Sequence, residues 1–126
     1  TRTKLEVWTV RKIINSTQNM KLKNFILRGK NGWCPEDTWN LDTYLAKVIA
    51  ESIKYLEKHT ISHPDGVTFK QWKKILKTIS EGIDAPYRLD ESVNNMGNFN
   101  KQAKIAYKKQ KKALKLLADN FNDLWN

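Results

Sequence analysis

The chain has a single cysteine, three prolines and no long apolar run. Cys34 cannot form an internal disulfide, so a reducing compartment is the simplest setting. No eighteen consecutive residues are apolar, and the first residues lack the apolar core of a secretory signal. We therefore expect a soluble protein of the cytoplasm that does not enter a membrane.

Catalytic and metal-binding motifs are also lacking. There is no glycine-rich phosphate loop, no His-Glu-x-x-His and no serine or cysteine in a recognisable nucleophile setting. His59 and His63 have only Asp65 nearby, which is not a credible zinc ligand set. We expect a protein that is not an enzyme, with no catalytic residues, no metal and no cofactor.

Acidic residues are absent from Ser92 to Ala118, the most informative stretch of the chain. We predict a helix from about Asn98 to Leu124. At about 100° per residue, one arc of this helix carries its lysine face, which consists of Lys101, Lys104, Lys108, Lys111, Lys112 and Lys115. A separate apolar stripe contains Ala103, Tyr107, Leu114, Leu117 and Phe121. Like charges at this spacing repel, so we expect an anionic partner to offset them.

Length and charge limit the remaining choices. A chain of 126 residues that is 40% hydrophobic is long enough for one core, and we expect a single domain over 1–126. The net charge of +10, from 23 basic and 13 acidic residues, attracts phosphates, nucleic acid or other anionic partners. A well-solvated surface without a specific ligand is the alternative explanation.

Apolar periodicity predicts an all-α bundle of about four helices, ending in the long basic C-terminal helix. The first helical segment covers 4–27, either as one interrupted helix or as two short ones, and the second covers about 36–58. The third begins at Thr68, which forms a capping box with Gln71, and ends at Gly82. The apolar residues of 83–97 follow no clear period, so we predict a loop there.

Aromatic and basic residues gather at two predicted turns. Arg28, Lys30 and Trp33 lie around two glycines, and Trp33 could offer a ring face to a base. We nevertheless favour the core for Trp33 and Trp39, as we do for Trp72 and Trp125. The later loop supplies an aromatic ring, a guanidinium and amides from Tyr87, Arg88, Asn94 and Asn95. Simple turn chemistry explains those asparagines equally well.

Asp42 lies at the edge of the second helix's apolar stripe. A carboxylate facing a core needs a partner, because burying it unpaired would be costly. We expect an ion pair with a basic residue of another helix, such as Arg28 or Arg11, in preference to a ligand contact.

The chain contains four motifs: Arg28-Gly-x-x-Gly-Trp33, Trp39-x-Leu-Asp-x-Tyr-Leu-Ala-Lys-Val-Ile49, His63-Pro-x-x-x-Thr-Phe-x-x-Trp72-x-x-Ile-Leu and a C-terminal Phe121-x-x-Leu-Trp125. Together they resemble a family of small, uncharacterised bacteriophage proteins. The resemblance spans most of the chain outside 83–99 and implies a viral accessory protein in the bacterial cytoplasm. The resemblance carries over no catalytic residues.

Three functions are compatible with these observations. The first is sequestration of a phosphate-rich nucleotide, such as a host immune signal, as a counter-defence. Its contacts would be phosphate binding by Arg28, Lys30, Arg88 and the lysine face, stacking on Trp33 or Tyr87, and amides from Asn94 or Asn95. The second is DNA or RNA binding without sequence specificity. The third is inhibition of an acidic host protein. The oligomeric state stays open, and a homo-oligomer is compatible with the sequence.

Overall fold

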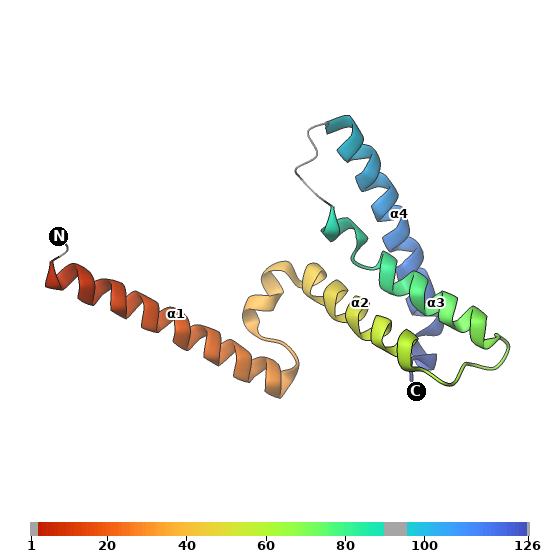
Figure 1. Ribbon diagram of the computed structural model, residues 1–126, viewed down its shortest axis with the longest axis horizontal. Coiled ribbons are helices and arrows are strands. Elements are labelled where there is room, and N and C mark those ends of the chain that lie inside the picture. The colour runs from red at the N-terminus through yellow and green to blue at the C-terminus, as the bar shows by residue number, and fades with distance from the viewer. Residues whose placement is uncertain (1–2, 90–95, 126) are drawn as a thin grey trace. The chain divides into compact units, whose positions relative to one another are not determined.

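The computed structural model describes residues 3–89 and 96–125, and every regular element within these ranges is helical (Figure 1). The four α-helices are α1 (Lys4–Asn31), α2 (Leu41–His59), α3 (Phe69–Gly82) and α4 (Met96–Asn120). Three short 3-10 helices are η1 (Pro35–Asn40), η2 (Ala85–Arg88) and η3 (Phe121–Asp123). The predicted all-α fold with a long basic C-terminal helix is confirmed. Among the described helices, none is long and apolar enough to span a bilayer.

The chain divides into two compact units, residues 1–41 and 42–126. The first contains α1 and η1, and the second contains the three remaining α-helices with η2 and η3. The expectation of a single domain over 1–126 stays a prediction.

In the unit of residues 1–41, α1 is one continuous helix rather than an interrupted one. Thr3 caps its start, since its hydroxyl accepts from the Glu6 amide while the Glu6 carboxylate accepts from the Thr3 amide. The polar residues 15–19 include no glycine or proline, so they continue the helix at little cost. Gly32, at φ 81°, ends it in the left-handed conformation that a glycine adopts without strain.

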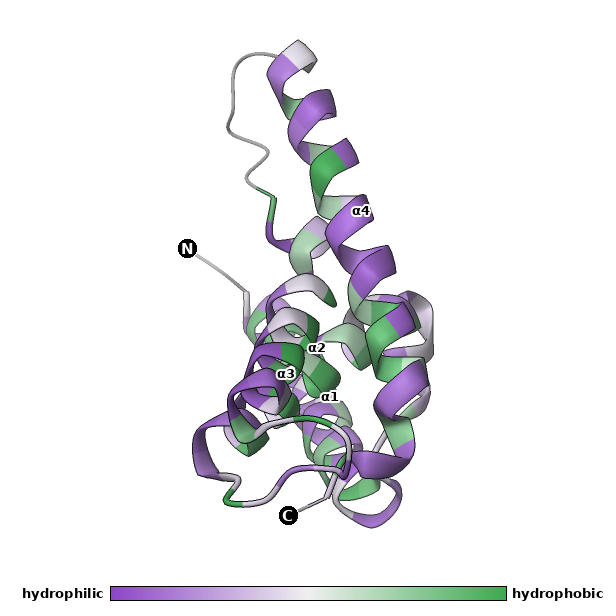
Figure 2. Ribbon diagram, turned by 90° about the vertical axis from the view of Figure 1, so that its right-hand side faces the viewer, coloured by the Kyte–Doolittle hydropathy of each residue, from purple (hydrophilic) through white to green (hydrophobic). Residues whose placement is uncertain are grey.

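The core of the unit of residues 42–126 is built from all three of its α-helices. Ile53 of α2 packs in one cluster with Trp72, Leu76 and Ile79 of α3. A second cluster joins Ala46 and Ala50 of α2 to Ile83 and to Ala113 of α4. Figure 2 shows the resulting alternation of hydrophobic and hydrophilic residues along α4.

Two of the tryptophan predictions are tested by this core. Trp72 is fully buried, as expected, whereas Trp125 lies beyond η3 and is 67% exposed, so its placement in the core was wrong. Trp125 follows the end of α4 at Asn120, where the helical period that put it in phase with the stripe no longer applies.

Local chemistry at the start of α3 agrees with the prediction. The Thr68 hydroxyl accepts from the Gln71 amide at 3.1 Å, and the Gln71 side chain accepts from the Thr68 amide at 2.9 Å. Val67 packs against the cluster that contains Trp72, as a hydrophobic staple requires. These contacts fix the direction in which α3 leaves the preceding loop.

Candidate anion-binding site

The lysine face of α4 is turned away from the core. The inward side of the helix consists of the buried Ala106 and Ala113 and the half-buried Ala103, Gln110 and Leu117. The centre of the lysine face lies roughly 180° around the helix from this inward side. All six of its lysines are exposed. The predicted separation of a basic face from a core face is confirmed.

The apolar stripe predicted for this helix was partly wrong. Tyr107, Leu114 and Phe121 were expected to face the core, and they are 57%, 48% and 64% exposed. Alanines take the contact positions because α3 and α4 pass very close to each other. A Cβ built on Gly82 would lie only 3.0 Å from the Ala113 Cβ, which leaves no room for a larger side chain.

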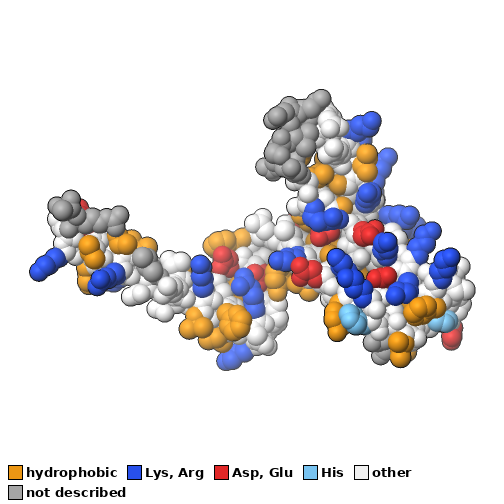
Figure 3. Space-filling view, in the orientation of Figure 1, with side chains coloured by type: hydrophobic (Ala, Val, Ile, Leu, Met, Phe, Trp, Pro, Cys, Tyr) orange, Lys and Arg blue, Asp and Glu red, His pale blue; other side chains and the backbone are white. Residues whose placement is uncertain are grey.

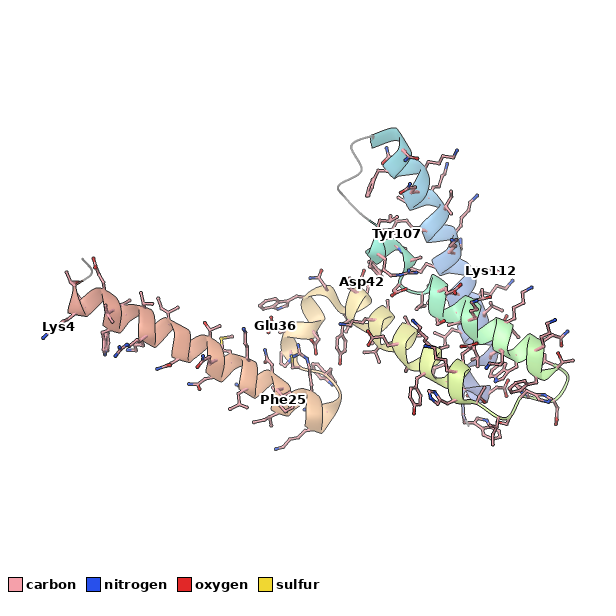
Figure 4. All side chains as sticks on the ribbon, in the orientation of Figure 1. Lys4, Phe25, Glu36, Asp42, Tyr107 and Lys112 are labelled. Atoms are coloured by element: carbon pink, nitrogen blue, oxygen red, sulfur yellow. The ribbon has the colours of Figure 1, made fainter. Side chains whose placement is uncertain are left out.

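Between α3 and α4 runs a basic groove, which we call the α3–α4 groove. It comprises two adjoining cavities of about 460 and 440 Å³ that share Thr78 and Lys112. Its charged lining consists of four basic residues and one acid: Lys74, Arg88, Lys109, Lys112 and Glu81. In Figure 3 the side chains of lysine and arginine crowd this part of the 42–126 unit, and Lys112 is labelled on α4 in Figure 4.

Arg88 is held in place at one end of this groove. Its Nε donates to Asp84 Oδ1 at 3.0 Å, and its Nη2 donates to the Glu81 carbonyl oxygen at 2.6 Å. The Glu81 carboxylate lies 3.9 Å from the Lys77 ammonium, so that acid is already near a cation. A guanidinium carries five N–H donors, and these two bonds therefore leave donors for an anion. The arrangement combines Arg88 with Lys109 and Lys112 around one cavity.

Tyr87, the neighbouring candidate, is part of a polar cluster. Its hydroxyl donates to Asp42 Oδ2 at 2.9 Å. The Gln110 amide bonds the Ile83 carbonyl oxygen at 3.0 Å. Gln110 lowers the pKa of Tyr87, and burial together with the Asp42 carboxylate outweighs it, so the net shift is upward. The prediction that Asp42 forms an ion pair with a basic residue was wrong, because its partner is the Tyr87 hydroxyl.

Arg28 already has an acidic partner within the unit of residues 1–41. Its Nη2 lies 2.6 Å from Asp37 Oδ1, and its Nε donates to Asp37 Oδ2 at 3.1 Å. The second carboxylate oxygen also accepts from the amide of the buried Cys34 at 2.9 Å. The hydrogen bond from Arg28 is the main cause that lowers the pKa of Asp37 to about 2. Burial opposes this shift, and the hydrogen bond from the Cys34 amide adds to it. The Arg28 guanidinium is thus bound in a bidentate structural pair, a role the sequence did not predict for it.

The remaining residues of the predicted turn are accessible. Lys30 lies in the last turn of α1, and Trp33 and Trp39 are 48% and 78% exposed. Trp33 and Trp39 therefore do not belong to the core of their unit. Asn94 and Asn95 lie outside the described residues.

The structure brings together only part of the predicted site. Arg88 and Lys112 line one cavity, and Tyr87 lies beside Arg88 in η2. The other lysine-face residues named as ligands, Lys104, Lys108, Lys111 and Lys115, are exposed on the same helix. Arg28, Lys30 and Trp33 belong to the other unit.

Sequence reasoning missed Lys74, Thr78 and Lys109 as groove residues. Lys109 is the one lysine of its stretch that lies off the lysine face, which is a signal that it points toward a neighbouring helix. Lys74 lies on the polar side of α3, and only the packing of α4 against that side turns it into part of a groove.

The α3–α4 groove can bind anions through charge and hydrogen bonds. Among the described residues, no three His, Cys, Asp or Glu side chains converge as metal ligands would. Lysine and arginine side chains at an open groove suit phosphate groups, which accept hydrogen bonds and carry negative charge. No protein-family model, curated protein or solved structure matches this chain.

Proposed function

We propose that this protein binds nucleic acid through the phosphate backbone, without sequence specificity. The observation that carries the proposal is the continuity of positive charge on α4. Its lysine face is exposed opposite the core, and Lys112 belongs both to that face and to the α3–α4 groove, where Lys109 and Arg88 lie. An extended polyanion can contact the face and the groove together.

The size of this surface suits several phosphates. From Lys104 to Lys115 the helix rises about 16 Å at 1.5 Å per residue, and double-stranded DNA carries one charge per about 1.7 Å of its axis. The lysine face presents a row of ammonium groups, which are point charges suited to contacts with backbone phosphates. Binding of this kind depends on charge and is weakened by salt.

A small phosphate-rich nucleotide is the second candidate ligand, and a specific observation favours it. The cavity of about 460 Å³ gathers Arg88, Lys109 and Lys112, which is enough positive charge for a short run of phosphates. In the setting that the resemblance to phage proteins implies, such binding would sequester a host nucleotide signal. We rank it second because Arg28, one of its predicted phosphate contacts, is already paired with Asp37.

Salt dependence separates the two candidates. Affinity for a 20-base-pair duplex and for a cyclic dinucleotide would be measured by fluorescence anisotropy from 50 to 200 mM salt. A duplex that neutralises about six lysine or arginine charges should lose roughly a thousandfold in affinity over this range. A small nucleotide has no condensed counterion atmosphere, so its affinity should change far less.

Each outcome has a clear meaning. A steep salt slope for the duplex, with no measurable dinucleotide binding, supports the proposal. Tight dinucleotide binding with a shallow slope would replace it with the second candidate. No binding of either ligand at 50 mM salt would rule out both.

A further inference from the structure

The three α-helices of the 42–126 unit are bordered by surfaces of different chemistry. Between α2 and α3 lies a cavity of about 500 Å³ lined by both signs of charge, including Glu51, Lys54 and Lys77. Between α3 and α4 lies the basic groove, which includes Lys109 and Lys112. The third side of the unit, between α2 and α4, is neither a cavity of mixed charge nor a basic groove.

Helix geometry identifies the residues on this third side. Glu51, Lys54 and Lys58 mark the flank of α2 that borders α3, so Leu45 lies on its opposite flank, with Val48 next to it. On α4, Lys109, Lys112 and Leu116 mark the flank toward α3. The opposite flank of α4 carries Tyr107 and Leu114, and Phe121 follows the helix as the first residue of η3. We call these five apolar residues of the third side the α2–α4 face: Leu45, Val48, Tyr107, Leu114 and Phe121.

The α2 and α4 parts of this face border the same core cluster. Ala46 and Ala50 of α2 form one buried cluster with Ile83 and with Ala113 of α4. Leu45 precedes Ala46 and Leu114 follows Ala113, so each is next to a contact residue and on the side away from α3. The two parts therefore lie beside the same core cluster, on the side away from α3.

This surface is apolar and open to water. Each of its five residues is about half exposed, with values from 46% for Val48 to 64% for Phe121. Tyr107 and Leu114 are seven residues apart, which places them in one row along α4, and Phe121 follows seven residues later as the first residue of η3. A row of this kind matches the anchor spacing of an amphipathic helix that lies along a hydrophobic surface.

The lysines that border this apolar row favour an acidic partner. Lys104, Lys111 and Lys115 border the row on its outer side, and residues 96–118 contain no acid. A second copy of the chain, with its net charge of +10, would bring like charges together at this border. A helix with glutamate or aspartate along its edges would instead pair with these lysines.

We propose that the α2–α4 face is the docking surface for an acidic amphipathic helix of another protein. Its apolar side would cover Tyr107, Leu114 and Phe121, and its acidic edge would meet Lys104 and Lys111. The proposal goes beyond nucleic-acid binding, because it depends on an apolar row that phosphate contacts do not use.

A peptide-display selection tests this directly. The probe is a library of 21-residue helical peptides with leucine at heptad positions a and d, in which the flanking e and g positions vary among Glu, Gln, Ser and Lys. The full chain is the immobilised target. We expect peptides with glutamate at the flanks to be enriched, and a synthetic copy of the best one to bind in solution.

The matched variants are Leu114→Gln and Ile105→Gln. Both residues are on α4 and both are 48% exposed, but Ile105 lies on a different side of the helix. Glutamine and leucine have similar helix propensity, so α4 should stay folded. We expect Leu114→Gln to weaken peptide binding roughly tenfold and Ile105→Gln to leave it unchanged. Phe121→Gln replaces Leu114→Gln if circular dichroism shows that the latter loses helix.

Four results would overturn the proposal. They are enrichment of no helical sequence, enrichment of lysine or neutral flanks, equal effects of the two variants, and a dimer in sedimentation velocity that Leu114→Gln converts to a monomer. The last result would show that the occupant is a second copy of the chain.

Discussion

Gly82 of α3 and Lys109 of α4 lie so close that a Cβ added to Gly82 would be 2.6 Å from the Lys109 carbonyl oxygen. The atom in the way is backbone, which cannot move aside as a flexible side chain would. The close crossing of α3 and α4, and with it the groove that holds Arg88 and Lys112, therefore depends on glycine at this position.

Gly82→Ala should force α3 and α4 apart. We expect the free energy of unfolding to fall by about 1–3 kcal/mol, as is usual when atoms are added to a tight core. Urea unfolding followed by circular dichroism measures it. Gly29→Ala is the control, because a Cβ there would meet nothing within 4 Å and alanine favours the helix by up to about 1 kcal/mol. Stabilisation by both substitutions would contradict the close crossing.

The lysine face should account for most of the nucleic-acid affinity. Replacing Lys104, Lys108, Lys111 and Lys112 with glutamine should reduce the slope of log affinity against log salt by about 3 to 4. A control with the same change in net charge replaces four exposed lysines elsewhere in the unit: Lys47, Lys54, Lys58 and Lys70. Equal loss of duplex affinity in both variants would mean that net charge alone, and not the lysine face, drives binding.

Acid should break the contact between Arg28 and Asp37 only at very low pH. The pKa of Asp37 is lowered from 3.8 to about 2, so the pair stabilises the unit fully above about pH 4 and loses this contribution as the pH falls toward 2. The amide proton of Cys34, which donates to Asp37, should report the titration in NMR spectra with a midpoint near 2. Asp37→Asn should abolish this transition, and a midpoint near 4 in the unchanged chain would refute the pair.

Tyr87 and Asp42 should stabilise the unit by a modest amount. Tyr87→Phe removes the hydroxyl donor and keeps the ring, so we expect a loss of about 0.5–1.5 kcal/mol, typical of one hydrogen bond. Asp42→Asn should cost a similar amount, and the double variant little more than either single one. Chemical denaturation of all four proteins gives this cycle. Fully additive losses would show that the two side chains do not interact.

Elements with complete local signals were predictable from the sequence. Thr68 and Gln71 predict the start of α3, because their reciprocal hydrogen bonds join residues that are only three apart in the sequence. The lysine face was predictable for a similar reason, since exposure of charged residues follows from periodicity and needs no knowledge of the neighbouring helices.

Features that depend on contact between distant segments were not predictable in the same way. The sequence favoured Tyr107 and Leu114 as inward residues because they are large and apolar. Helix packing instead selected Ala106 and Ala113, because the crossing near Gly82 has room only for small side chains. The groove residues Lys74 and Lys109 were missed because their proximity arises only when α3 and α4 pack together.

Asp37 lies near the start of the second predicted helix, where an acid favours the positive end of the helix dipole, and in the structure it is also the partner of Arg28. Both roles are compatible with one acid near a helix start, so periodicity alone could not reveal the pair. The position of Asp37 in a 3-10 turn, three residues after Cys34, is what aims its carboxylate at α1.

The glycine at position 82 also bears on how distant relatives of this protein could be found. A chain with a bulkier residue there would have to hold α3 and α4 further apart, and its alanine at the position of Ala113 would then leave a void. The two positions are therefore expected to vary together, since a change at one alters the space available to the other. A search for proteins that share this groove should weight that pair above the lysines, which other basic residues could replace without changing the backbone.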